Sequence, residues 1–185
     1  MARLRYSVIA SLDGYVVDAE GSFAWAAPDE EVHAAVNDEQ RGIGTLLLGR
    51  RMYEVLRFWD DPLPPDAPAV MHDYANVWRD ADKVVHSTTL DAVDGPRTSL
   101  ARSFDAAAVR AMVDRSERDV SVGGPGLAGA ALRAGIVDDL CLYAVPHVVG
   151  GGTSWLPSGL ATSLVLVDVH RFAGGVVRSR YTLGR

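Results

Sequence analysis

A glycine-rich turn in the second half of the chain has the residue types of an anion-binding site. Gly123, Gly124, Pro125 and Gly126 follow a short β-branched run, and a helix of small residues is expected directly after them. Glycine lets a phosphate approach the backbone because it has no Cβ, and the free N–H groups of a helix start favour negative charge. The segment is neither a G-x-G-x-x-G motif nor a P-loop. It therefore predicts either a phosphate site or a tight strand-to-helix turn that binds nothing.

Two other turns carry side chains that can bind a phosphate. Arg50 and Arg51 come directly after an apolar run and Gly49, and at a helix start they could hold a phosphate by charge-assisted hydrogen bonds. The hydroxyls of Ser87 and Thr88 follow another apolar run and add further donors. Two phosphate sites at one sheet edge suit a dinucleotide with an additional phosphate, such as NADPH. The alternative is that the arginines belong to a solvated helix end and that the hydroxyls only cap a turn.

An acid and several aromatic residues could complete a site for an organic substrate. Asp13 follows the first expected strand and could orient a substrate or relay a proton, although Leu-Asp-Gly-Tyr is also a good turn sequence. Tyr15, Trp25 and Trp59 could wall an aromatic substrate pocket, or they could simply pack a long loop. The histidines show no ligand spacing, so we expect no metal site.

Strands that alternate with helices must position these residues. The alternation over the first 140 residues, followed by a β-rich tail, predicts a three-layer α/β/α fold with a mixed, mainly parallel sheet. Asp29 and Asp105 are the expected N-caps of two of its helices. Ligands of such sheets bind outside the carboxyl ends of the strands, so the three turns should meet at one edge. The expected strands are 4–11, 45–48, 83–86, 97–102, 120–122 and 140–145.

The tail is expected to be an antiparallel hairpin, from 163–171 through a Gly174-Gly175 turn to 176–183. Its first strand has apolar residues at both alternating sets of positions, because Leu164 and Leu166 interleave with three valines. Asp168 follows Leu164 and Leu166 in one of these two sets, so both faces of the strand are mostly apolar, and we expect the hairpin to be well covered.

Composition limits the class of protein. The length fits one domain over residues 1–185, with 48% hydrophobic and 23% charged residues. The net charge is −6 and no basic cluster exceeds Arg50-Arg51, which argues against broad nucleic-acid binding. No apolar run approaches 18 residues, so we expect no membrane partner. The single cysteine, Cys141, cannot form a disulfide within the chain, and we expect it to be buried in a cytoplasmic protein.

Five segments in order resemble the dihydrofolate reductase-like family, and within it the group like the reductase domain of bifunctional riboflavin biosynthesis proteins. The resemblance covers nearly the whole chain. The segments are Ser-Leu-Asp-Gly-Tyr at 11–15, Leu-Gly-Arg-Arg-Met-Tyr-Glu at 48–54, Lys-Val-Val-His-Ser-Thr-Thr-Leu at 83–90, Val-Gly-Gly-Pro-Gly-Leu-Ala at 122–128 with Gly-Ile-Val-Asp-Asp-Leu at 135–140, and Pro146 followed by three glycines at 150–152.

The resemblance implies an NADPH-dependent reductase with a small-molecule substrate, often a homodimer. It implies that Gly49, Arg50 and Arg51 lie at the adenosine-phosphate end of the cofactor, together with Ser87 and Thr88. It also implies that the paired glycines can be joined by a cis peptide. The residues that would cradle the pyrophosphate are Gly123, Gly124, Gly126 and Leu127.

The substrate stays open in this resemblance. Asp29, Glu30 and Glu31 lie in the region where dihydrofolate reductases carry a proton-donating acid, but the spacing to Gly49 gives no unique match. We expect hydride transfer to a small heteroaromatic or imine-like substrate. The alternatives are a 5-amino-6-(5-phosphoribosylamino)uracil reductase of riboflavin biosynthesis and a non-catalytic nucleotide-binding protein.

Overall fold

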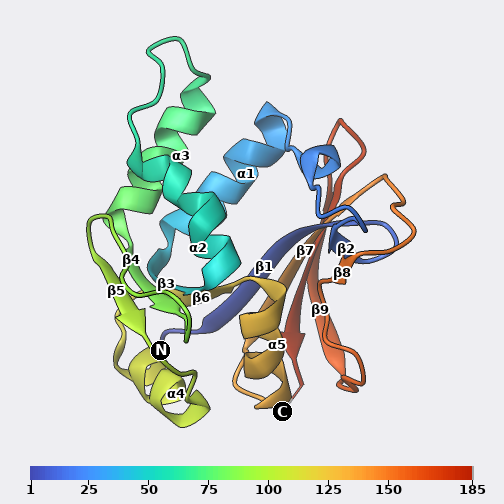
Figure 1. Cartoon of the computed structure of the whole chain (residues 1–185). Coiled ribbons are helices and arrows are strands. Elements are labelled where there is room, and N and C mark those ends of the chain that lie inside the picture. Colours follow the sequence, from blue (N-terminus) through green and yellow to red (C-terminus); the bar gives the residue numbers. More distant parts are fainter. Residues whose placement is uncertain (185) are drawn as a thin grey trace.

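The computed structural model describes residues 1–184, and its centre is one eight-stranded sheet with the order β5-β4-β3-β6-β1-β7-β10-β9 (Figure 1). Neighbours from β5 to β7 are parallel, and β10 is antiparallel to both β7 and β9. The mainly parallel sheet with a C-terminal antiparallel hairpin is thus confirmed. A small second sheet pairs β2 (Tyr15–Val17) with β8 (Thr153–Ser154). The main strands are β1 Leu4–Ser11, β3 Ile43–Gly49, β4 Asp82–His86, β5 Thr98–Ala101, β6 Asp119–Gly123, β7 Asp139–Val145, β9 Leu164–Arg171 and β10 Val177–Leu183.

Helices cover both faces of this sheet and make the expected three layers (Figure 1). On one face, α1, α2 and α3 place Val32, Tyr53 and Trp78 against it, and on the other α4 and α5 place Val109 and Leu132. No helix among residues 1–184 is long and apolar enough to span a membrane. The helices are α1 Glu30–Arg41, α2 Arg50–Leu56, α3 Ala69–Asp80, α4 Ala106–Arg115 and α5 Pro125–Arg133, with 3-10 turns η1 Ala24–Ala26 and η2 Arg57–Asp60.

Local sequence explains where several elements begin and which way they face. The carboxylates of Asp29 and Asp105 accept backbone N–H groups in the first turns of α1 and α4, as the sequence predicts. In β3, Leu47 packs toward α4 and α5, whereas its neighbours Leu46 and Leu48 pack toward α2 and α3. This alternation explains why the strand is a continuous apolar run, since both of its faces are covered.

The chain has one cysteine and one lysine, and both are buried in the sheet. Cys141 of β7 is a buried free thiol, as expected, and burial raises its pKa, so it stays protonated. Lys83 of β4 is the only lysine of the chain and has no exposed surface. Its Nζ donates to the Trp78 carbonyl at 3.0 Å and lies 4.9 Å from the centre of the Trp78 ring. These contacts hold a buried ammonium group beside an aromatic face.

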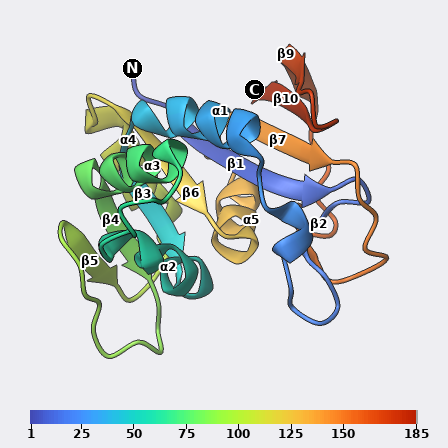
Figure 2. The same cartoon turned by 90° about the horizontal axis from the view of Figure 1, so that it is seen from above.

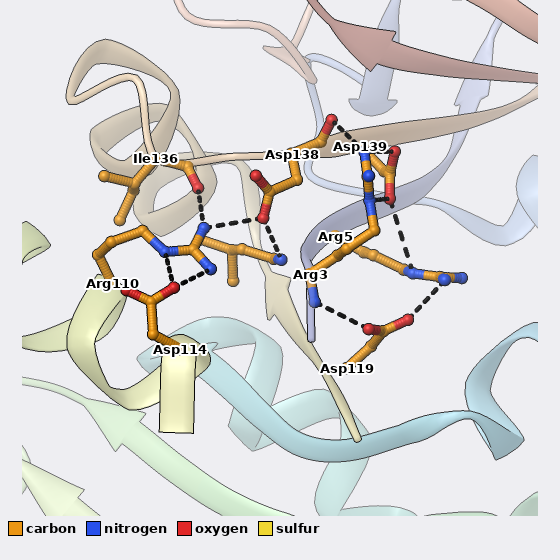
Figure 3. Close-up of polar contacts among 9 residues, drawn as sticks. Arg3, Arg5, Arg110, Asp114, Asp119, Ile136, Asp138 and Asp139 are labelled. Atoms are coloured by element: carbon orange, nitrogen blue, oxygen red, sulfur yellow. Dashed lines mark hydrogen bonds and ion pairs between the residues drawn. The ribbon is translucent and has the colours of Figure 1, made fainter. Parts of the chain in front are cut away.

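Ion pairs fasten the amino ends of three neighbouring strands, away from the carboxyl edge (Figure 3). The guanidinium of Arg3 donates to both carboxylate oxygens of Asp139, at 2.5 and 2.6 Å. The guanidinium of Arg5 pairs with the carboxylate of Asp119 at 2.5 Å. Asp138 accepts the N–H of Leu4 and also binds Arg110 of α4 at 2.8 Å. The Asp138-Asp139 pair of the Gly-Ile-Val-Asp-Asp-Leu segment therefore ties β1, β7 and α4 together, and Asp119 ties β6 to the same end of β1.

The expected cover over the C-terminal hairpin is not present, so that prediction is wrong for the single chain. The side chains of Val165, Leu166, Val167 and Val169 are exposed, with fractions between 53% and 58%. β9 is the last strand of the sheet and lies against β10, beyond the reach of the helices that cover the centre (Figure 2). Apolar residues at both alternating sets of positions favour burial of both faces of a strand. They do not tell which element covers those faces.

Candidate functional site

Three of the sequence-predicted turns meet at one edge of the sheet. β4, β3 and β6 are adjacent parallel strands, with Gly49 opposite His86 and Leu48 opposite Gly123. Their carboxyl ends therefore bring Gly49, the Ser87-Thr88 turn and the Gly123-Gly124 turn together. Figure 2 shows α2 and α5 starting beside the ends of β3 and β6. The sequence-based prediction that these turns share one edge is confirmed by this strand order.

Arg50 joins two of these turns directly. Its Nε donates to the Glu54 carboxylate at 2.7 Å, one helical turn further along α2, and its guanidinium also donates to Thr89 Oγ1 at 3.0 Å. Arg51 is exposed, and its guanidinium makes no hydrogen bond or ion pair within residues 1–184. The start of α2 thus carries one anchored and one unpartnered cation. Sequence reasoning did not assign Glu54, although its spacing of four residues from Arg50 is the signal that could have found it.

The Ser87 hydroxyl has an internal role in its turn. It accepts the backbone N–H groups of Thr89 and Leu90 at 3.2 and 3.1 Å, and the residue is buried. This is the turn-capping alternative for Ser87. Thr88 is exposed at the same turn. Contact of either hydroxyl with a ligand stays a prediction.

The glycine turn has one tight side and one open side. A Cβ on Gly123 would lie 3.0 Å from Leu48 Cδ2 and 3.3 Å from Met52 Cγ, so glycine lets β6 pack closely against its neighbours. Gly124 has a φ of +91°, a conformation that favours glycine. A Cβ on Gly126 would meet nothing within 4 Å. The peptide bonds of residues 1–184 are all trans, so the cis peptide that the resemblance allows is not found.

Two helices start at this edge without a side-chain cap. α2 begins after Gly49 and α5 after Gly124, and no side chain accepts a hydrogen bond from their first N–H groups. Leu127 lies in the first turn of α5, where backbone N–H groups have no partner within the helix. Uncapped helix starts combine free donors with the positive end of the helix dipole. Together with Arg50 and Arg51 they form an edge suited to bind phosphate groups.

Asp13 lies beyond the end of β1 and connects two loops. Its two carboxylate oxygens accept the N–H groups of Val149 and Gly150 at 3.2 and 2.7 Å. A hydrogen bond from Ser11, followed by these two amides, lowers the pKa of Asp13 below its ordinary value. The side chain is therefore ionised at neutral pH and holds the 149–150 loop. These contacts favour a role in positioning over a role as proton donor.

The expected aromatic residues divide between two places. Trp25 stacks on His147 with 5.6 Å between ring centres, and Tyr15 pairs with Ser154 in the small sheet, so both lie near the loops that Asp13 connects. Trp59 instead packs on His33 and Tyr74 in the helical layer. Tyr15 and Trp25 thus stay candidates for substrate contact, and the structure places Trp59 in a separate aromatic cluster.

The strands separate between the glycine turn and Asp13. β1 pairs with β6 only at its amino end, where Leu4 and Arg5 lie opposite Val120 and Ser121. Beyond that point β1 continues to Ser11 along β7. The region between the carboxyl ends of β6 and β1 therefore lies between the turns suited to bind phosphate and the loops held by Asp13. Parallel sheets commonly bind their ligands where neighbouring strands diverge in this way.

Comparisons with known proteins agree on one family and one fold. The family model described as the RibD C-terminal domain matches residues 2–178. A putative riboflavin biosynthesis protein from Shewanella sp. PV-4 has a TM-score of 0.75 at 16% identity, covering 99% of both chains. A pyrimidine reductase-like protein from Corynebacterium diphtheriae has a TM-score of 0.70 at 17% identity, covering 100% of this chain and 92% of that one.

A dihydrofolate reductase from Enterococcus faecalis, solved as a complex with NADP(H), shares the fold as well. Its TM-score is 0.64 at 14% identity, covering 99% of this chain and 97% of that one. A comparison with curated protein sequences finds no match. The dihydrofolate reductase-like fold expected from the sequence motifs is confirmed by these solved structures.

Proposed function

The chain belongs to the RibD C-terminal domain family, and from this membership and the carboxyl edge of its sheet we propose that it is an NADPH-dependent reductase. The proposed substrate is a small heteroaromatic or imine-like molecule that accepts a hydride. The observation that carries the proposal is the pair of uncapped helix starts at Gly49 and Gly124, on neighbouring strands, beside Arg50 and Arg51.

The residues at this edge fit a dinucleotide phosphate. The open side of Gly126 leaves room for a phosphate against the first N–H groups of α5. We infer that this turn, with Leu127, would hold the pyrophosphate, and that Arg50 and Arg51 would hold the additional phosphate of the adenosine end. Ser87 and Thr88 would line that end, with Ser87 acting through the shape of its turn.

The protein would mainly provide position and a suitable environment. NADPH supplies the hydride when it is bound. Arg50 is already held by Glu54 and Thr89, so its guanidinium needs little reorganisation to meet an anion. Asp13 would keep the 149–150 loop in place beside Trp25 and Tyr15, which are the proposed substrate-contacting residues. This arrangement would present a substrate between the ends of β6 and β1.

A second candidate is the reduction of 5-amino-6-(5-phosphoribosylamino)uracil in riboflavin biosynthesis. The family match favours it, as does a solved structure whose name includes that reductase activity, from Thermotoga maritima, with a TM-score of 0.66 at 14% identity. This chain covers only 57% of that longer protein. The pyrimidine is therefore the first substrate to test within the broader proposal.

Cofactor titration followed by turnover tests the proposal. NADPH is added to the protein while tryptophan fluorescence is recorded, and absorbance at 340 nm is then followed with pterins, flavin precursors and imines. We expect saturable binding at a Kd in the range of about 1 μM to 1 mM and NADPH oxidation with at least one substrate. No saturation at millimolar NADPH would refute the proposal. Binding without turnover across the panel would favour a non-catalytic nucleotide-binding protein.

A further inference from the structure

Two loops beyond the carboxyl ends of β1 and β7 are joined into one unit, which we call the Asp13 loops. They are residues 12–31, which follow β1, and residues 146–163, which follow β7. The N–H of Leu12 donates to the His147 carbonyl at 2.8 Å. The carboxylate of Asp13 and the pairing of β2 with β8 join the two loops further. Charges on either loop therefore act on the same place at the edge of the sheet.

The Asp13 loops carry the surplus negative charge of the protein. They contain six acidic residues and no lysine or arginine, and the net charge of the whole chain is −6. The rest of the chain is therefore neutral on balance. None of the six carboxylates forms an ion pair within residues 1–184. The six acids are Asp13, Asp18, Glu20, Asp29, Glu30 and Glu31.

Arginines at the carboxyl edge lie on other elements. Arg50 and Arg51 start α2 after β3, and β6 separates β3 from β1. Arg57 of η2 pairs with Asp94 at 3.7 Å. Arg171 ends β9, which is two strands beyond β7 in the sheet. A phosphate or carboxylate of a substrate bound at the Asp13 loops would thus meet acidic side chains and no guanidinium or ammonium group of these loops.

The same loops expose apolar and aromatic side chains. The exposed fractions are 70% for Leu12, 49% for Phe23 and 63% for Val148. Trp25 is partly exposed and stacks on His147, with an angle of 7° between the ring planes. Aromatic side chains stack on flat rings and attract cations to their faces. Apolar contact area beside unpaired negative charge suits a flat organic cation.

We propose that the hydride acceptor of this protein is a cyclic imine or nitrogen heteroaromatic that binds as its protonated cation and carries no phosphate or carboxylate group. The inference rests on the proposed function, since it takes the Asp13 loops as the substrate side of the edge. It narrows that function away from the phosphorylated pyrimidine. The phosphate of that compound would be repelled by the unpaired carboxylates of the loops.

A cationic acceptor also fits an ionised Asp13. In the transfer, the C–H bond of the reduced nicotinamide breaks, and the hydride forms a new bond at the carbon of the C=N group. The electron pair of the C=N π bond moves to the nitrogen, which already carries its proton, so the product is a neutral amine. Nearby carboxylates favour the protonated form of the imine before the transfer. Asp13 therefore keeps its loop contacts and donates no proton.

Probes that differ in charge test this inference on the protein saturated with NADPH. The cation is N-methylquinolinium, the anion is quinoline-4-carboxylate, and calorimetry measures both affinities. At low salt we expect the cation to bind at least about tenfold more tightly. Raising the salt from about 20 to about 200 mM should weaken binding of the cation, because salt screens exposed charges. 5-Amino-6-(5-phosphoribosylamino)uracil should bind less tightly than the same compound without its phosphate.

Matched charge reversals locate the effect on the molecule. Glu20→Lys reverses an exposed acid of the Asp13 loops, and Glu117→Lys reverses an exposed acid between α4 and β6, at the amino ends of the strands. At low salt, Glu20→Lys should weaken binding of the cation by about threefold and strengthen binding of the carboxylate by a similar factor. Glu117→Lys should change neither affinity. Far-UV circular dichroism identifies a variant that has not folded.

The outcomes separate this inference from the cofactor proposal. Carboxylate or phosphorylated pyrimidine that binds as tightly as its uncharged or cationic counterpart would overturn the inference and leave NADPH in place. The same holds if the NADPH-saturated protein binds no cation, or if neither salt nor Glu20→Lys changes the affinity for the cation. A protein that does not bind NADPH would refute the proposed function, and the inference with it.

Discussion

At the scale of single residues, Arg50 is the side chain on which the cofactor proposal depends most. It lies between a carboxylate and a hydroxyl, and it is half exposed. Glu54 holds the guanidinium in place but also neutralises part of its charge, so Arg51 supplies the unpartnered cation at this helix start. A phosphate group would join Arg50 by exchanging with the Thr89 hydroxyl or by using the remaining donors of the guanidinium.

Replacement of Arg50 should change the affinity for NADPH but not the affinity for NADH. A hydrogen bond to a charged group contributes about 1.5–3 kcal/mol, so Arg50→Ala should weaken NADPH binding about tenfold to a hundredfold. NADH lacks the additional phosphate, and its affinity should barely move. Fluorescence titration of both cofactors measures the difference. Arg115→Ala, an exposed arginine at the end of α4, is the matched control. Equal binding of NADH and NADPH by the native protein would remove this role from Arg50.

Asp13 gives a second residue-scale test, because its lowered pKa makes a definite statement about protonation. A carboxyl whose pKa is lowered in the folded state stays ionised at neutral pH, and its loop contacts weaken only as the pH falls through that lowered value. Such a group can hold the 149–150 amides but has no proton to give at pH 7.

We therefore expect Asp13→Asn to lower kcat at pH 7 by less than about tenfold, because loss of a general acid or base would cost about 10²–10⁴-fold. KM should rise, since the amide holds the 149–150 loop less firmly. Steady-state kinetics at several pH values, with Asp66→Asn as an exposed loop control, gives the comparison. A fall in kcat of a hundredfold or more would instead indicate that Asp13 acts as a general acid or base.

At the scale of elements, the way helices begin distinguishes the site from the scaffold. α1 and α4 are preceded by aspartates whose carboxylates accept hydrogen bonds from N–H groups of the first helical turn. α2 and α5 begin at glycines, and their first N–H groups face the carboxyl edge without a side-chain acceptor. An acid at either start would improve the helix but would repel a phosphate.

Substitutions in the start of α5 should separate stability from binding. Gly126→Ala meets no neighbour and lies in a helix, so it should raise stability by up to about 1 kcal/mol while its methyl group weakens NADPH binding. Gly124→Ala places a Cβ at a φ of +91° and should lower stability by about 1–2 kcal/mol. Chemical unfolding and fluorescence titration of the same variants test both. Unchanged NADPH affinity in Gly126→Ala would place the pyrophosphate elsewhere.

At the scale of the whole molecule, the two ends of the parallel strands have different tasks. The amino ends of β1, β6 and β7 are tied by ion pairs that include Arg3 and Asp139. The carboxyl ends carry glycines, uncapped helices and loops, and they make few such ties. These ion pairs are thus concentrated at the amino ends of the strands, and the loops at the carboxyl ends are left available for a ligand.

Sequence patterns predicted the parts of this arrangement that depend on local chemistry. The strand runs, the caps at Asp29 and Asp105 and the glycine turn are short-range signals, and together they place the three turns on one edge. Contacts between distant segments could not be read in the same way. Asp13 meets residues 149–150, more than 130 positions away, and Arg50 meets Thr89. The cover over β9 was mispredicted because apolar periodicity does not say whether the same chain or another one supplies the cover.

The burial of Lys83 has a practical consequence for labelling. It is the only lysine, its amine is enclosed beside Trp78, and burial lowers its pKa. Amine-reactive dyes should therefore leave the side chain of Lys83 unmodified while the protein is folded. Because no other side chain carries an amine, side-chain labelling by such a dye would report that the packing around Lys83 and Trp78 has opened, without any mutagenesis.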